Sequence, residues 1–406
     1  MTDLQQVLRE ATDHVASPDL AGRALASAHR HRVRRTAVGA LAAVVLLGGG
    51  VAFAVQDRTP HADVVDTPAP TPTPTPEVVD SNPATQEVWD PFTLADAPRR
   101  PSVLAEQLSP PVAAPSIVAA PLPDIVVAWP QEGADLRLLA SNGDWRSVPG
   151  TATAIQGTLS DVVRPAISPD GSEVAMATDA GILVVSASTG AQETIPWPSG
   201  LEGPWDTRPQ VLWRPDDAGF VVMHWERPWL VDLEGNGREA PFGTRNASQV
   251  MVDPDTGVIR ESRWQGSTIL TWDGDQVVSR VPRRGYGERW VTRYGLAAYT
   301  GSPGQFDLGV LKTGPVVVDT ATGDVVAYAP IRDASSVYSD NGHLTAMGFL
   351  DKSTVLLLVT PMDFRTMETG DATTHLVAWE PSTGDFELIA SGGPGMRSIA
   401  VAPDLL

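Results

Sequence analysis

Short apolar segments alternate with turns rich in Gly, Asp and Pro from Asp124 onward. The apolar segments are only a few residues long, which is typical of strands rather than helices. Gly and Asn accept the positive φ of tight turns, so the pattern predicts successive antiparallel hairpins. The repeated hairpin turns are Ser141–Asp144, Ser188–Gly190, Glu234–Gly237, Asp273–Asp275, Ala321–Asp324 and Ser382–Asp385.

A second kind of turn, centred on Pro-Asp, recurs upstream of the hairpin turns. It occurs at Ser168–Gly171, Arg214–Asp217 and Asp253–Thr256, with a degenerate copy at Leu350–Lys352. Two turns per unit predict four strands per unit, and a repeat of roughly 40–60 residues is typical of a β-propeller. We expect an all-β fold, a single β-propeller of six four-stranded blades, with seven blades as the alternative.

The segment Ser398–Asp404 repeats the first strand and turn of a unit. The first unit, in contrast, begins at Ile125–Trp129 and lacks a first strand of its own. An unpaired strand edge is a liability, so we expect strand 398–403 to complete the first blade. The predicted propeller domain is therefore 124–406.

The run Thr36–Val55 contains no charged residue and, at 1.5 Å per residue, spans about 30 Å, the thickness of a bilayer core. The Arg-rich segment His29–Arg35 precedes it, so the positive-inside rule predicts a cytoplasmic N-terminus. Residues 1–35 are then a helical cytoplasmic tail, 36–55 a transmembrane helix and the remainder extracytoplasmic. Two alternatives are a signal peptide cleaved after Ala54 and a buried core helix.

Residues 56–123 form a predicted stalk. Prolines alternate with other residues in Thr67–Pro76, which favours an extended polyproline II conformation and a semi-rigid spacer. The later part is more apolar, with Trp89, Phe92 and Leu94 among its residues. We therefore expect residues 88–122 to pack on the propeller.

The Ser168-Pro169-Asp170-Gly171 turn and its copies resemble those of WD40-like propeller repeats in bacterial envelope proteins. The resemblance covers about two-thirds of the chain. An Arg-rich tail, one span, a Pro/Thr stalk and a propeller together resemble actinobacterial single-pass membrane proteins with such repeats. This likeness implies a fold and a location in the cell membrane, but no particular activity.

The net charge is −20, and residues 1–35 carry +2, which leaves −22 for the remainder. A strongly acidic domain argues against nucleic acid as a partner, because phosphate contacts need a basic surface. The chain has no cysteine, which excludes disulfides, thiol catalysis and thiolate metal sites.

Catalytic and metal motifs are absent from the sequence. The propeller histidines, His224, His343 and His375, come from different units without metal-ligand spacing. Asp253–Gly257 resembles the start of a calcium loop but lacks its later ligands. We predict no catalytic residue, metal or cofactor. An enzyme using carboxylates that converge in space is the remaining catalytic alternative.

The loops opposite the repeated turns contain Trp, Tyr and Arg, the residues enriched at binding hot spots. The candidate binding face consists of Trp205, Arg208, Trp225, Arg227, Arg245, Trp264, Arg283, Arg284, Tyr286, Arg332 and Arg365. Alternatively, these tryptophans pack between blades and the arginines pair with acidic groups.

These features favour a membrane-tethered recognition or scaffold module with a protein or cell-wall partner on the propeller face. A transmembrane regulator is the second interpretation, with the propeller as sensor and the tail holding a cytoplasmic factor. Its topology resembles that of anti-sigma proteins, although their zinc-binding His/Cys motif is missing.

Overall fold

The computed structural model describes residues 84–85, 88–154, 164–201, 209–215, 218–224, 227–243, 248–263, 268–283, 286–303, 313–332, 343–362 and 373–406. All of them belong to the unit Val79–Leu406. Within these ranges no helix is long and apolar enough to cross a membrane. The tail, the predicted span 36–55 and the Pro-rich first part of the stalk lie outside the described residues.

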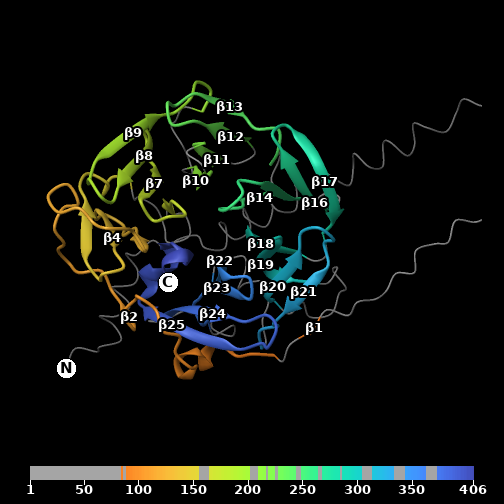
Figure 1. Cartoon of the computed structure of the whole chain (residues 1–406). Helices are drawn as coiled ribbons and strands as arrows, with labels where there is room; N and C mark the ends of the chain where they lie inside the picture. Colours follow the sequence, from red (N-terminus) through yellow and green to blue (C-terminus); the bar gives the residue numbers. More distant parts are fainter. Residues whose placement is uncertain are drawn as a thin grey trace, which may run out of the picture. The chain divides into compact units, whose positions relative to one another are not determined.

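Six sheets are arranged as the blades of one ring, each with four antiparallel strands (Figure 1). The prediction of an all-β propeller with six four-stranded blades is confirmed. Blade 2 is β6 (Ala166–Ile167), β7 (Glu173–Ala177), β8 (Gly181–Ser186) and β9 (Gln192–Pro196). Blade 3 is β10 (Gln210–Trp213), β11 (Phe220–His224), β12 (Arg227–Val231) and β13 (Gly237–Glu239). Blade 4 is β14 (Ser248–Val252), β15 (Ile259–Arg263), β16 (Thr268–Asp273) and β17 (Gln276–Pro282).

Blades 5 and 6 each gain a fifth strand from the N-terminal side. Blade 5 is β18 (Tyr286–Arg293), β19 (Leu296–Ser302), β20 (Gly314–Asp319) and β21 (Val325–Tyr328), with β1 (Ala84–Thr85) added. Blade 6 is β22 (Leu344–Asp351), β23 (Thr354–Val359), β24 (Thr374–Trp379) and β25 (Phe386–Gly392), with β2 (Gln107–Leu108) added.

Blade 1 combines the two ends of the propeller sequence. Its strands are β26 (Ala400–Val401), β3 (Val127–Trp129), β4 (Leu136–Leu139) and β5 (Trp145–Val148). Ala400 pairs with Ala128 and Val401 with Val127, in antiparallel register. The paired strand is shorter than 398–403. Ser398 ends the 3-10 helix η2 (Pro394–Ser398), and Pro403, which has no N–H to donate, begins η3 (Pro403–Leu405).

The third-to-fourth strand turns of the six blades, and the first-to-second strand turns of blades 2 to 6, lie on one side of the ring, because adjacent strands are antiparallel. We call this side the turn face. Aspartate side chains close several of these turns: the Asp232 carboxylate accepts hydrogen bonds from the backbone N–H groups of Glu234 and Asn236, at 3.1 and 2.7 Å. Gly143 and Gly235 occupy corresponding turn positions with φ of 86° and 83°, which only glycine adopts without strain.

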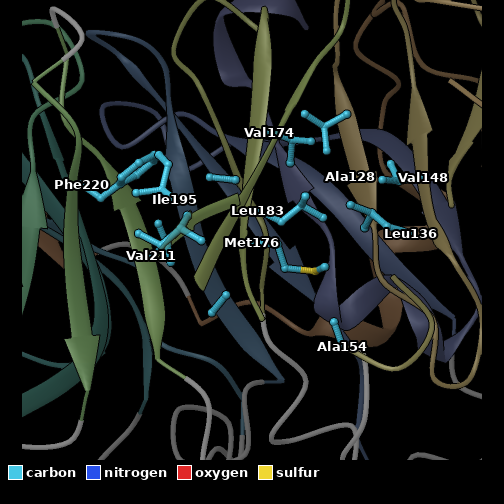
Figure 2. Close-up of a cluster of buried hydrophobic side chains, with 14 of the residues drawn as sticks. Ala128, Leu136, Val148, Ala154, Val174, Met176, Leu183, Ile195, Val211 and Phe220 are labelled. Carbon is cyan, nitrogen blue, oxygen red and sulfur yellow. The ribbon is translucent and has the colours of Figure 1, made fainter. Parts of the chain in front are cut away.

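Apolar side chains pack between successive blades and form the core. Figure 2 shows such side chains from blades 1, 2 and 3 lying between their sheets, among them Leu136, Met176 and Phe220. They belong to one continuous buried cluster. Each blade therefore depends on its neighbours for burial.

Residues 84–85 and 88–122 form a belt along the outer strands of blades 5, 6 and 1. β1 pairs in parallel with β21, and β2 pairs in parallel with β25. Parallel bridges also join Trp89 to Ile331 and Ser116 to Ser147. The belt thus lies on the propeller through backbone pairing as well as through buried side chains such as Leu94, Leu108 and Ile117.

Buried side chains anchor the belt at three successive blade junctions. Leu94 lies in the cluster between blades 5 and 6, Leu108 in the cluster between blades 6 and 1, and Ile117 in the cluster between blades 1 and 2. The Trp89 indole N–H donates to the Ala329 carbonyl at 3.0 Å, and its ring stacks on Phe386 at 4.3 Å. The belt therefore spans the same junction that β26 closes.

An ion-pair cluster joins three distant parts of the propeller. Arg293 donates two hydrogen bonds to the Asp255 carboxylate, at 2.9 and 2.6 Å, and also pairs with Asp404. Asp255 lies in a turn of blade 4, Arg293 ends β18 of blade 5, and Asp404 lies in η3. The guanidinium also lies 4.8 Å from the Tyr294 ring centre. The hydrogen bonds from Arg293 hold the pKa of Asp255 below its ordinary value.

We predict that Ile117→Ala lowers the free energy of unfolding by about 2–5 kcal/mol, because the Ile117 side chain is fully buried and its removal leaves a cavity. Val112→Ala is the matched control, since Val112 is 99% exposed in the same belt. Thermal or denaturant unfolding of the full chain measures both. Equal stability of the two variants would mean that the belt does not contribute to propeller stability.

We also predict a pH-dependent contribution from Asp255. A carboxylate with a lowered pKa stabilises the folded state above its unfolded pKa of about 3.9, and this stability is lost as the pH falls through the folded-state pKa. The difference in Tm between the wild type and Asp255→Asn should be largest near neutral pH and disappear in acid. Glu132→Gln, an exposed carboxylate between β3 and β4, is the control. A difference that grows in acid would contradict the assignment.

Candidate functional site

Most of the predicted binding face lies outside the described residues. This applies to Trp205, Arg208, Trp225, Arg245, Trp264, Arg284 and Arg365. Arg227 and Arg332 are exposed, whereas Tyr286 is described only by its backbone in β18. The candidate face as a whole stays a prediction.

Arg283 is buried, with 6% of its surface exposed. Its guanidinium lies 5.5 Å from the Trp290 ring centre and donates to the Gly287 carbonyl at 3.4 Å. The Trp290 indole N–H donates to the same carbonyl, at 3.1 Å. Arg283 is therefore buried beside Trp290 and does not form part of an exposed patch.

A groove of about 780 Å³ lies between blades 3 and 4, toward the turn face. Blade 3 contributes residues from its two turns and from β12 and β13, and blade 4 contributes residues from its two turns and from β15, β16 and β17. The groove is lined by Arg214, Ala218, Leu230, Val231, Asp232, Asn236, Gly237, Arg238, Thr256, Gly257, Val258, Ile259, Thr271, Trp272, Asp273, Gly274 and Val278.

Part of the groove's lining is apolar, and hydrogen bonds hold its tryptophan in place. Trp272 is 8% exposed, and its indole N–H donates to the buried Glu261 carboxylate at 3.1 Å. Arg263 donates two further hydrogen bonds to that carboxylate, at 2.8 and 3.1 Å. Leu230 faces the groove from blade 3, and Val278, which is 60% exposed, lies at its rim. The tryptophan wall is therefore preorganised for contact with an apolar group.

Charged side chains surround the groove. Arg238 pairs with Asp275 at 2.6 Å, a contact from blade 3 to blade 4. Burial lowers the pKa of Arg214, and the positive charge of Arg238 lowers it further. The hydrogen bond from the Asn236 side chain, followed by backbone N–H groups, lowers the pKa of Asp232. Guanidinium donors and carboxylate acceptors at one rim suit the polar groups of a peptide backbone.

Sequence reasoning placed the candidate residues on the loops and overlooked this groove, which lies toward the turns. One signal for it was the pair Val277-Val278, which follows the Asp273–Asp275 turn. Adjacent residues of a strand point to opposite faces, so two apolar neighbours in an outer strand place at least one of them toward solvent. Both valines are in fact exposed, at 39% and 60%.

Within the ranges that the structure describes, no group of three or more His, Asp or Glu side chains is placed to hold a metal ion. The calcium-like segment Asp253–Gly257 is a turn: the Asp253 carboxylate accepts from the backbone N–H groups of Asp255 and Thr256, both at 3.1 Å. Its other oxygen lies 3.4 Å from Arg260. These carboxylates are already engaged by protein donors.

His375 and Ser391 form a pair of the kind that can act as base and nucleophile, with 2.9 Å between the imidazole Nδ1 and the hydroxyl oxygen. Both residues are buried between β24 and β25, and burial lowers the pKa of His375. The belt covers the outer side, since the Ser391 N–H donates to the Glu106 carbonyl at 2.9 Å. A nucleophile needs access to substrate, so this pair contributes to packing.

No protein-family model matches the chain, and no curated protein matches it either. Three solved structures are similar in part. Hydrazine synthase from Kuenenia stuttgartiensis has 16% identity and a TM-score of 0.40, over 60% of this chain and 69% of that chain. The WD40 β-propeller domain of Doa1 has 13% identity and a TM-score of 0.41, over 66% and 79%. A protein assigned as TolB from Agrobacterium tumefaciens has 15% identity and a TM-score of 0.40, over 60% and 86%. Scores of this size mark a distant likeness and indicate no function.

Proposed function

We propose that this protein is a membrane-tethered, extracytoplasmic recognition module that holds a protein partner in the groove between blades 3 and 4. The observation that carries the proposal is the groove itself, an opening of about 780 Å³ with an apolar wall and a charged rim. This is the composition of a protein interface, in which an apolar centre is surrounded by polar groups.

Two properties of the groove favour binding. Trp272, Arg238 and Val278 offer an aromatic wall, a guanidinium and an exposed apolar side chain, and Trp and Arg dominate binding hot spots. The hydrogen bond from Trp272 to Glu261 fixes the wall before any partner arrives. A preorganised surface loses less conformational entropy on association.

Tethering rests on the N-terminal sequence. The uncharged run Thr36–Val55 and the preceding segment His29–Arg35 support a single span with a cytoplasmic tail. The alternating prolines of Thr67–Pro76 support a stalk that holds the propeller away from the bilayer. The proposed location is therefore the cell membrane, with the groove on the extracytoplasmic side.

We predict that a reporter enzyme active only outside the cytoplasm is active when fused after Pro123. The full chain should also keep its N-terminal residues, since the apolar run is expected to stay in the bilayer rather than be removed. Activity of the fusion in intact cells and mass spectrometry of the mature N-terminus test these two points. A mature chain that begins at Val55 would make the protein secreted instead of anchored.

We predict that Val278→Glu lowers partner retention by about fivefold or more, because it places a charge beside the apolar wall of the groove. The full chain in detergent is cross-linked to membrane and envelope proteins of its host, and retained proteins are quantified by mass spectrometry. Val326→Glu is the matched control, since Val326 is an exposed valine of the outer strand β21 outside the groove. Equal retention by both variants would exclude the groove as the binding site.

A further inference from the structure

The groove between blades 3 and 4 has a counterpart between blades 1 and 2. The third-to-fourth strand hairpins of blades 1 and 3 correspond residue by residue, through the turns 140–144 and 232–236. In blade 1 the Ala140 N–H donates to the Asp144 carbonyl at 3.0 Å, and in blade 3 the Asp232 N–H donates to the Asn236 carbonyl at 2.9 Å. The outer strands β5 and β13 therefore have the same backbone groups at equivalent positions along their outer edges.

The protein's own belt lies along the first of these two outer strands. The Ser147 N–H donates to the Pro115 carbonyl, and the Ile117 N–H donates to the Ser147 carbonyl, both at 2.9 Å. Arg146 donates from its Nε to the Ala120 carbonyl at 2.7 Å. The belt then reaches blade 2, where the Leu122 N–H donates to the Ala187 carbonyl at 2.8 Å. The belt thus bridges to β5 at Ser116 and then forms the turn 116–120, in which the Ala119 and Ala120 N–H groups donate to the Ser116 carbonyl at 3.1 and 3.0 Å. Ile117 is fully buried in this turn.

Blade 3 repeats the donors that hold the belt. Arg146 pairs in register with Leu138, and Arg238 pairs in the same way with Leu230. Glu239 corresponds to Ser147. Because the Ala240 N–H points inward to the Pro228 carbonyl, at 2.8 Å, the backbone N–H and carbonyl of Glu239 point outward. An outward backbone pair therefore lies beside the groove, next to the exposed guanidinium of Arg238 in its ion pair with Asp275.

The other wall of each junction is the third-to-fourth strand turn of the next blade, and the junctions differ in whether other residues cover this turn. A Cβ at Gly190, in the blade 2 turn, would collide with the Ile117 carbonyl of the belt. The corresponding glycines of blades 3 and 5, Gly235 and Gly323, are covered by Pro196 and Pro282. The turn of blade 4 has only two residues, Gly274 and Asp275, so its glycine does not correspond to these, and the opening beside blade 4 is shown by the groove of about 780 Å³ itself. The place that the belt takes beside blade 2 is open beside blade 4.

We infer that the groove between blades 3 and 4 binds a segment of a partner protein that bridges to the outer edge of β13 and then turns, in the way that Pro115–Ala120 bridges to β5. The inference deepens the proposed function and rests on it. Strand addition to an exposed edge supplies backbone hydrogen bonds, while a pocket selects a side chain. The selected side chain is a branched apolar one, against Leu230 and Trp272. Small residues and proline flank it, as they flank Ile117 in the belt.

The probe is a labelled peptide of the belt sequence, residues 114–122 with both termini capped, titrated with the full chain in detergent and followed by fluorescence anisotropy. Saturable binding is expected. Arg238→Ala and Val278→Glu should each weaken it by about fivefold or more. The matched controls are Arg280→Ala and Val326→Glu, exposed side chains outside the groove, which should bind as the wild type does. Introducing Ile117→Asp in the peptide should abolish binding.

Thermal unfolding of each variant separates loss of binding from loss of fold. Peptide binding that does not respond to Arg238→Ala or Val278→Glu would overturn the inference. The absence of saturable peptide binding would also overturn the inference. If partner retention still depended on Val278 in that case, the proposed function would stand without this mode of peptide binding. Self-association of the full chain that is lost in Val278→Glu, with no peptide binding, would identify a second copy as the occupant.

Discussion

Closure of the ring between blades 6 and 1 is the constraint on which the described structure depends. The blades bury their apolar faces against one another, so an open junction would expose two faces at once. The strand that closes the ring, β26, is only Ala400–Val401, so two residues form the whole pairing between the two ends of the propeller sequence. The belt adds a second closure on the outside: Leu108 is buried in the cluster of blades 6 and 1, and the chain continues along blade 1 to Ile117, in the cluster of blades 1 and 2. Two segments far apart in sequence, β26 and the belt, thus close the junction between blades 6 and 1.

The belt also explains how the junctions differ from one another. It covers the outer strands of blades 5, 6 and 1, and its apolar side chains occupy the junctions that it crosses. The described part of the belt does not extend along β13 or β17. Between those blades the third-to-fourth strand turn of blade 4 meets open space at Gly274, and the groove is lined by Trp272 and Leu230. One fold therefore contains both a filled and an open version of the same junction.

The described polar groups are consistent with recognition. Buried carboxylates such as Glu261 and Asp253 are satisfied by Trp272, Arg263 and backbone N–H groups, which fixes walls and turns. The cluster of Arg293 with Asp255 and Asp404 similarly joins blades 4 and 5 to the C-terminal segment. The hydrogen bonds to Glu261 hold the Trp272 side chain in place, and a wall already in place loses less conformational entropy when a partner binds.

The sequence by itself determined the strands, the turns and the number of blades, because alternation of apolar segments with Gly and Pro-Asp turns is a local property of the chain. It also indicated that strand 398–403 belongs near the first unit, since repeats reveal a missing element. Only the tertiary structure decided that Ala400 and Val401 alone form that strand, that Arg283 is buried beside Trp290, and that an open groove lies toward the turns. These outcomes depend on which segments from distant parts of the chain fill each junction, and no local pattern specifies that.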